Sequence, residues 1–163
     1  MMHRNDFLKI AVAIVFIAIV LVLFFMPRAA ADDVSGFADV QEDGTLIISG
    51  HPVRLYGIYI PPTGHTCQTS IRPIPCGSRA QLALNFKIEG EFVHCTPIAE
   101  NQDGSMTASC RVGSEDLSEW MLQRGWAVTL PGAPFSFAAM ENIAKSRGIG
   151  VWGIPVEIPA PRR

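Results

Sequence analysis

An uncharged apolar stretch near the N-terminus decides how much of this 163-residue chain can fold as a domain. The stretch runs from Ile10 to Met26, follows the basic residues Arg4 and Lys9, and is followed by small residues that end at Ala31. A basic start, an apolar core and an A-x-A pattern are typical of a signal peptide, so we predict cleavage after Ala31. Seventeen apolar residues are also the short limit of a membrane-spanning helix, so an uncleaved anchor through 10–26 stays open. Both alternatives place Asp32 and everything after it outside the cytoplasm.

The 132 residues that follow this segment are enough for one modest hydrophobic core. Their net charge is about −4, because residues 1–31 hold three basic residues and one acidic residue of a chain whose charge is −2. Proteins that bind nucleic acid without sequence preference are usually basic, since neutralising phosphates supplies most of their affinity. The charge therefore argues against a non-specific nucleic-acid binder.

All four cysteines, Cys67, Cys76, Cys95 and Cys110, lie beyond the apolar segment. Four cysteines in a small exported domain favour two disulfides, for which the sequence alone allows three connectivities. A zinc site would use His65 with Cys67 and Cys76, or His94 with Cys95. Neither set has the CxxC or HxxxH spacing that is typical of zinc ligands.

Apolar and β-branched runs bounded by turn residues predict five strands, at 37–40, 45–48, 53–59, 91–96 and 106–112. Three helices are predicted, the first between the third and fourth strands and the others after the fifth: one from an N-cap at Ser78 to Gly90, one from an N-cap at Ser114 to Gly125, and one over 137–147 with Ala138, Met140, Ile143 and Ala144 inward. Residues 32–36 are interpreted as a flexible lead-in and 154–163 as an extended, Pro-rich tail.

This order of elements, β-β-β-α-β-β-α-α, is that of an OB barrel, in which a helix separates the third and fourth strands. The predicted fold class is therefore α+β and mainly β: a five-stranded OB barrel with about three helices over 37–153, preceded by an N-terminal hydrophobic helix.

Several short motifs occur here in the order and spacing found in thermonuclease-like (staphylococcal-nuclease-like) domains. They are Val53 to Ile58, Cys76-Gly77 at a helix start, the Cys95…Cys110 hairpin, Asp116-Leu117 through Gly125-Trp126-Ala127, and Arg147-Gly148-Ile149-Gly150-Val151-Trp152. The chain resembles that family from Phe37 to Trp152. The resemblance implies an OB barrel with three helices and, where the site is intact, a calcium-dependent phosphodiesterase.

The residues that the resemblance assigns to catalysis are mostly replaced in this chain. Gly44 and Tyr59 stand at positions where the family carries metal-binding aspartates, Pro62 stands at the position of the general base, and Ser105 stands at the position of the second phosphate-binding arginine. Leu130 to Pro134 replace the tyrosines that stack on substrate. Independently of the family, no Asp or Glu occurs from Gly44 to Ile88, although Ca²⁺ needs six to eight oxygen ligands.

One residue of the family's pattern survives, the phosphate-binding Arg54. Asp43 lies one position from a metal-binding site of the pattern, which in a strand is a change of face unless a bulge intervenes. A weak nuclease rebuilt around Asp43, Arg54 and Asp103 is therefore the enzymatic alternative. By strand alternation, Tyr56 shares a face with Arg54 and Tyr59 lies on the other; both tyrosines could stack on a ligand or simply pack on the barrel.

Placed on these elements, the cysteines are paired Cys67 with Cys76, closing the loop before the first helix, and Cys95 with Cys110, crossing the hairpin of the fourth and fifth strands. The sequence thus predicts an exported nuclease-like domain without metal, cofactor or catalysis, in the bacterial periplasm or anchored to the inner membrane through 10–26. It would act as a binding or assembly module for a protein partner or an anionic polymer, with nucleic acid possible but not favoured. Ca²⁺ belongs only to the alternative of a weak nuclease.

Overall fold

The computed structural model describes residues 15–17, 32–67 and 73–153. Residues 1–31 and 32–163 form two separate units. In the first unit, Val15 to Ile17 are helical; the rest of the predicted 10–26 span and the cleavage position after Ala31 lie outside the described residues, as does the predicted tail. Within the described ranges, no helix combines the length and the apolar character needed to cross a membrane.

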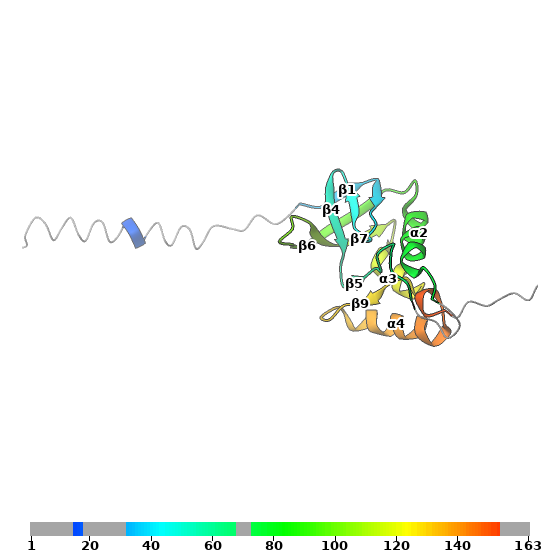
Figure 1. Ribbon diagram of the computed structural model, residues 1–163. Helices are drawn as coiled ribbons and strands as arrows, with labels where there is room; N and C mark the ends of the chain where they lie inside the picture. Colours follow the sequence, from blue (N-terminus) through cyan, green and yellow to red (C-terminus); the bar gives the residue numbers. More distant parts are fainter. Residues whose placement is uncertain (1–14, 18–31, 68–72, 154–163) are drawn as a thin grey trace, which may run out of the picture. The chain divides into compact units, whose positions relative to one another are not determined.

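Seven short strands form the main sheet of the second unit: β1 (Val34–Gly36), β2 (Ala38–Val40), β3 (Leu46–Ile48), β4 (His51–Leu55), β6 (Val93–Glu100), β7 (Met106–Val112) and β8 (Glu115–Asp116). Their order is β1-β6-β7-β4-β3-β2, with β8 paired to β7. β1 and β2 are consecutive in the chain yet stand at the two ends of this order, so residue Phe37 links the two edges. The sheet is therefore nearly closed and barrel-shaped (Figure 1).

The sheet differs from the predicted five strands in two places where the chain bends. Residues 34–36 are not a flexible lead-in, because they form β1 and pair with Val93–Cys95. The predicted strand 53–59 is divided by a turn at Tyr56-Gly57 into β4 and β5 (Ile58–Tyr59), and β5 pairs with β9 (Val128–Thr129) in a separate two-stranded sheet. Apolar and β-prone residues continue on both sides of the turn, so the sequence pattern predicted one strand where the structure has two.

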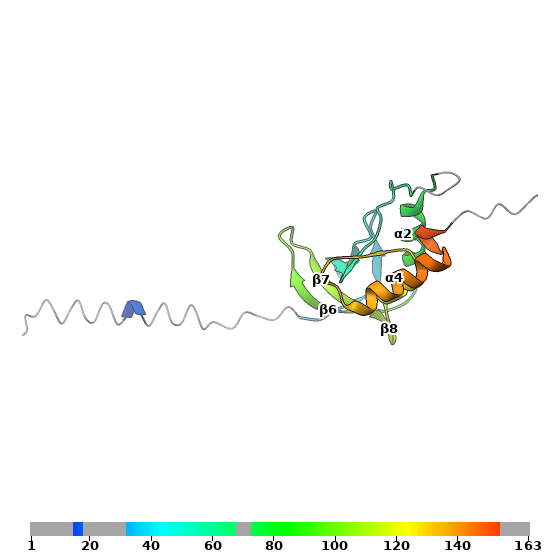
Figure 2. The ribbon, with the colours of Figure 1, turned by 90° about the horizontal axis from the view of Figure 1, so that it is seen from below.

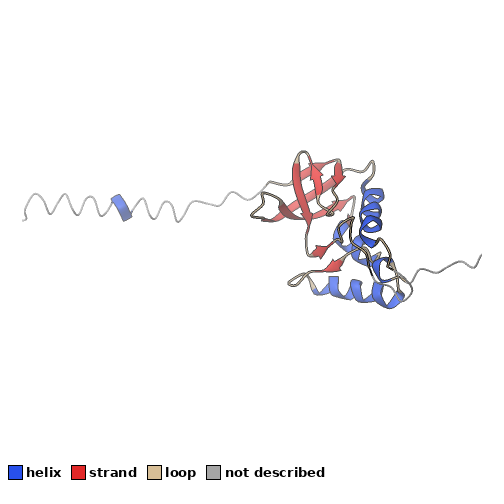
Figure 3. Cartoon of the chain, viewed as in Figure 1, coloured by secondary structure: helices blue, strands red, loops and turns tan. Residues whose placement is uncertain are grey.

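Three α-helices and one 3₁₀ turn cover the sheet from one side (Figure 3). They are α2 (Cys76–Ile88), α3 (Leu117–Gln123), α4 (Phe135–Arg147) and η1 (Gly150–Trp152). Leu84 and Ala80 of α2 and Leu117 and Met121 of α3 are fully buried in the core that the barrel strands form. α4 packs against α3 and β9, and η1 lies beside α2 (Figure 2). The predicted α+β class is confirmed.

The helices begin at other residues than the sequence predicted. Pro75 precedes α2, and the predicted cap Ser78 lies inside the helix, where its hydroxyl donates to the Thr63 carbonyl. Asp116, not Ser114, caps α3 by accepting a hydrogen bond from the Glu119 N–H at 3.0 Å. Helix α3 was given the wrong cap because Ser114 and Asp116 can both cap a helix, whereas α2 starts without a side-chain cap.

In α4, Ala144 is buried as predicted, whereas Ala138 and Met140 are only partly buried. Ile143 is half exposed, so its predicted inward position is wrong. Phe137 and Glu141 are the inward residues in its place.

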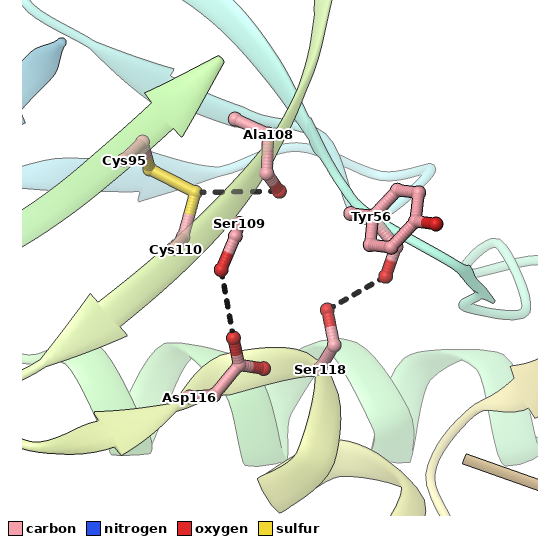
Figure 4. The surroundings of a disulfide bond; sticks show 7 residues. All are labelled: Tyr56, Cys95, Ala108, Ser109, Cys110, Asp116 and Ser118. Atoms are coloured by element: carbon pink, nitrogen blue, oxygen red, sulfur yellow. Dashed lines mark hydrogen bonds between the residues drawn. A yellow bond between two sulfur atoms is a disulfide. The ribbon is translucent and has the colours of Figure 1, made fainter. Parts of the chain in front are cut away.

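Two disulfides join Cys67 to Cys76 and Cys95 to Cys110, which are the predicted pairs. Cys95 and Cys110 lie directly opposite each other on β6 and β7, with Cα atoms 4.0 Å apart, and both are buried (Figure 4). Disulfides persist in oxidising compartments and are rare in the cytosol. The two bridges therefore point to a location outside the cytoplasm.

A close backbone approach explains why Gly77 opens α2. A Cβ at this position would lie 1.7 Å from the Pro62 carbonyl oxygen, so only glycine allows the helix to start against that loop. The contact places Pro62 against the helix N-terminus. It thereby sets the path of the segment that follows β5.

Candidate functional site

One open pocket of about 260 Å³ lies at the rim of the barrel, between the end of β4, the turn before β3 and the β5/β9 sheet. Its polar lining comes from Asp43, Thr45, Arg54 and Tyr59. Its apolar lining comes from the barrel residues Leu55, Ile58 and Ile60, together with Leu130 after β9. Ile58, Ile60 and Leu55 are buried, as is Thr45, whereas Asp43, Arg54 and Tyr59 are exposed.

Arg54 is flanked by two aspartates that occupy matching turns. β4 lies between β3 and β7 in the sheet, and a turn of the form Asp-Gly-Thr or Asp-Gly-Ser precedes each of these neighbours. In the first turn the Asp43 carboxylate accepts a hydrogen bond from the Thr45 N–H at 2.9 Å, and in the second the Asp103 carboxylate accepts one from the Ser105 N–H at 3.1 Å. The repeated tripeptide therefore presents one carboxylate on each side of the central arginine.

Asp103 makes a direct ion pair with Arg54, whose guanidinium donates to Oδ2 at 2.7 Å. The other carboxylate oxygen, Oδ1, accepts from the Ser105 hydroxyl at 2.6 Å. Both partners of the ion pair are half exposed, and exposed ion pairs contribute little to stability, roughly 0–1 kcal/mol. Arg54 can therefore exchange this partner for a ligand at small cost.

Both carboxyl groups are ionised at neutral pH. Hydrogen bonds from Ser105, aided by the charge of Arg54, hold the pKa of Asp103 below its ordinary value. Burial acts to raise the pKa of Asp43, but the hydrogen bonds from Thr45 and the charge of Arg54 outweigh it, so this pKa is also lowered. One cation and two anions give the cluster a net charge of −1.

The two tyrosines take the opposite places from those that strand alternation predicted. Tyr59 is half exposed and lines the pocket with Arg54, whereas Tyr56 packs edge-to-face on Phe137 with ring centres 6.5 Å apart. The cause is the turn at Gly57, whose φ of +73° resets the alternation between β4 and β5. The Ser118 hydroxyl donates to the Tyr56 carbonyl at 2.9 Å and holds this turn against α3 (Figure 4).

A buried glutamate that the sequence analysis missed supports the rim of the pocket. Glu141 of α4 accepts a hydrogen bond from the Thr129 N–H at 2.8 Å and forms an ion pair with Lys145 at 2.6 Å. β9 in turn pairs Val128 with Tyr59. The only signal for this role was an acidic residue on the inward face of the predicted third helix.

The residues of this pocket do not fit a calcium ion. Asp43 is the single carboxylate in its lining, and Asp103 is engaged by the guanidinium that stands between them. Ca²⁺ takes six to eight oxygen ligands and would have to bind beside a positive charge. Neither Pro62, which is partly buried, nor Ser105, which is buried, lines this pocket.

The histidine and cysteines considered for zinc meet at one place in the part of the chain that the structure describes. The ligand atoms of His65, Cys67 and Cys76 lie within 4.8 Å of one another. However, both sulfur atoms are joined in a disulfide and are not thiolates, which are the form that binds zinc. His94 is exposed on β6 and packs on Phe92 with ring centres 5.0 Å apart, while Cys95 is bonded to Cys110.

The chain matches no family model. It is 26% identical over 127 residues to the succinoglycan biosynthesis protein ExoI of Rhizobium meliloti (strain 1021). The match covers 76% of this chain and spans 66% of the length of that protein.

Proposed function

We propose that this chain is an exported binding or assembly module, built on a thermonuclease-like OB barrel that has lost phosphodiesterase chemistry. The observation that carries the proposal is the charge at the pocket: the lining holds one arginine, Arg54, and one carboxylate, Asp43, beside apolar residues, and Arg54 is also paired with Asp103 next to the pocket. This arrangement can recognise a ligand by hydrogen bonds and contact. It lacks the parts that would hydrolyse one.

The strand order supports the OB assignment. If β1 and β2 are counted as one bent strand, five strands follow one another around the barrel. Their order is first (β1 and β2), fourth (β6), fifth (β7), third (β4) and second (β3), which is again next to the first; β4 and β7 pair in parallel. A helix, α2, separates the third from the fourth strand, as in OB barrels. Counting the bent first strand once leaves six strands in the main sheet: the five of the predicted ring and the two-residue β8, which pairs with β7.

Hydrolysis of a phosphodiester in this kind of site needs a metal ion, a base and positive charge on the phosphate. The pocket offers one cation, and Pro62 has no side chain that accepts a proton. Ser105 already donates its hydroxyl to Asp103, so it cannot replace a second arginine. The lack of a metal ion, of a base and of a second positive charge would each lower the rate of hydrolysis separately.

The disulfides, the predicted signal segment and the similarity to ExoI support a role in the envelope of a bacterial cell. Within that setting we place the folded unit in the periplasm, released by cleavage after Ala31 or held at the inner membrane by 10–26. ExoI is named for the biosynthesis of succinoglycan, a glycan, and this favours the biosynthesis of a polysaccharide as the process served.

The test is a cleavage assay with the full-length chain in mild zwitterionic detergent. We expect no cleavage of single-stranded DNA or RNA with millimolar Ca²⁺ above a chelator control. Cleavage that needs Ca²⁺ and disappears in an Arg54→Ala variant would refute the proposal, and a Phe86→Ala variant, altered at an exposed residue outside the pocket lining, serves as the matched control.

A weak nuclease with a rebuilt site is the second candidate, favoured because Asp43, Arg54 and Asp103 do gather around one strand. In that case Asp43 would be the principal metal ligand. Any Ca²⁺-dependent cleavage would then fall by roughly a hundredfold in Asp43→Asn, the size of effect expected for losing a principal charge-stabilising group. Cleavage that this substitution leaves unchanged would come from a contaminant.

A further inference from the structure

The charge arrangement of the pocket distinguishes between the ligands that a binding module could take. Arg54 is the one basic side chain in the lining that the described residues provide, and it is flanked by Asp43 and Asp103, both ionised at neutral pH. A phosphodiester or an acidic sugar bound here would be attracted by one cation, Arg54, and repelled by two anions, Asp43 and Asp103. Affinity for nucleic acid comes chiefly from neutralising phosphates, and here the local charge is of the wrong sign.

The same three side chains suit a ligand rich in hydroxyl groups. Carboxylates only accept hydrogen bonds and a guanidinium only donates them, whereas a hydroxyl does both. A neutral sugar unit can therefore donate to Asp43 or Asp103 and accept from Arg54 at adjacent hydroxyls. Hydrogen bonds with one ionised partner are also the stronger kind, so such contacts offset the loss of water.

Tyr59 and Leu130 add an apolar surface beside this polar group. Their exposed fractions are 47% and 43%, so nearly half of each side chain is open to solvent. Tyr59 lies on β5 and Leu130 directly follows β9, and the Leu130 N–H donates to the Gly57 carbonyl at 2.9 Å, so both are fixed by backbone pairing. A sugar ring has C–H faces that pack on such a surface while its hydroxyls point to the sides.

The size and the openness of the pocket limit the unit that enters. A volume of about 260 Å³ is just below the roughly 300–1,000 Å³ usual for enclosed ligand sites. Half-exposed residues form its rim, so a longer chain can continue out of the pocket on either side. The pocket therefore fits one ring of a polymer and does not enclose a whole small ligand.

We propose that this pocket binds one neutral sugar unit of a polysaccharide, with Asp43 and Arg54 of the lining, and Asp103 beside Arg54, on its hydroxyls and with Tyr59 on its ring face. This inference rests on the proposed binding function and names its ligand class. It takes a neutral polymer in place of the anionic polymer that the sequence analysis left open, because the two carboxylates next to Arg54 make the local charge negative.

The experiment is an amide NMR titration of the full-length chain, in a detergent without sugar head groups. The probes are neutral hexose tetrasaccharides of several linkages, tetragalacturonate and a DNA tetranucleotide. We expect at least one neutral tetrasaccharide, at concentrations on the order of 10 mM or below, to shift amides around residues 43–45, 54–60 and 130. We expect it to bind more tightly than either anionic probe.

Variants separate stacking from charge. Tyr59→Ala should weaken binding of the neutral sugar by about tenfold or more, in line with the loss of a stacking contact. Phe86→Ala, which removes an exposed aromatic ring outside the pocket, should leave the affinity unchanged. The double variant Asp43→Asn, Asp103→Asn should weaken the sugar and strengthen the tetranucleotide.

Three results would overturn the inference: no shift with any neutral sugar, tighter binding of an anionic probe, or equal loss in Tyr59→Ala and Phe86→Ala. Amide spectra of each variant without ligand show whether the fold is intact. If the titration shows no sugar binding and the protein also lacks nuclease activity, the sugar ligand is contradicted but the proposed binding function is not. Calcium-dependent cleavage would instead remove the proposed function itself.

Discussion

Among single residues, Glu141 has the largest structural role relative to its signal in the sequence. It is an acidic side chain with 8% exposure, and it holds the Thr129 N–H and Lys145. Burial acts to raise its pKa, but the hydrogen bonds from Lys145 and Thr129 outweigh this, so the pKa lies below the ordinary value. The ionised form is therefore the one that the folded protein stabilises.

We expect Glu141→Gln to lower the free energy of unfolding at pH 7 by about 1 kcal/mol, because Gln can still accept from the Thr129 N–H but loses the charge, and hydrogen bonds to charged groups contribute roughly 1.5–3 kcal/mol against about 1 kcal/mol for neutral ones. A depressed folded-state pKa stabilises above the unfolded value, and this stability is lost as pH falls through the folded value. The difference between wild type and variant should thus shrink below about pH 4.5, the ordinary pKa of Glu. Urea unfolding at several pH values measures it.

Glu100→Gln is the matched control, since Glu100 is exposed on β6. It should change the free energy of unfolding by only a few tenths of a kcal/mol at any pH, as usual for exposed substitutions. A Glu141→Gln deficit that persists unchanged at low pH would contradict the role of the charge. It would indicate that packing alone is altered.

At the scale of elements, the two disulfides stabilise different parts of the fold. Cys95–Cys110 crosses the β6–β7 hairpin inside the core, where exposure is 2% and 0%. Cys67–Cys76 closes the loop into α2, and Cys67 is partly exposed. The first therefore stabilises the barrel and the second anchors a helix start.

Under native conditions dithiothreitol should reduce Cys67–Cys76 first, because thiol exchange needs access to a sulfur. Alkylation followed by mass mapping would identify the bridge that opens. Replacing Cys95 and Cys110 by Ser should cost about 3 kcal/mol and replacing Cys67 and Cys76 somewhat less, since the bridged separations are 15 and 9 residues. Earlier reduction of Cys95–Cys110 would mean that the barrel opens more readily than the loop.

For the whole molecule, the open question is how the first 31 residues are processed. We expect the product exported by a bacterial host to begin at Asp32 and to stay in the aqueous phase on detergent partitioning. Ala31→Arg should block cleavage and move the protein into the detergent phase, because signal peptidases require small residues before the cut. Intact mass and phase partitioning measure both effects, and Ser35→Arg, beyond the predicted site, is the control.

An unmodified product that retains its N-terminus and partitions into detergent would show that 10–26 is an anchor. The location outside the cytoplasm would still stand, because the disulfides support it independently. The export segment in the first unit and the disulfides in the second thus support the same compartment independently of each other.

Local patterns were enough for the class of the fold and the disulfide pairs, whereas Asp43, Arg54 and Asp103 were singled out through the family resemblance. Turn residues, helical periodicity and cysteine placement act over a few positions, so they can be interpreted along the chain. The similar positions of Asp43 and Asp103 on either side of Arg54 also have a local signal, because each begins a tripeptide of the form Asp-Gly-Thr or Asp-Gly-Ser. What these patterns could not provide was the exchange of Tyr56 and Tyr59, the β1 pairing and the role of Glu141.

Those three features depend on contacts between residues that are far apart in sequence. Tyr59 enters the pocket because the turn at Gly57 directs β5 toward β9, about 70 residues later. Val34–Gly36 become a strand because β6 offers them an edge. Alternation predicts a face only while a strand continues, and where it bends the free energy of pairing with a distant strand decides which side chains meet.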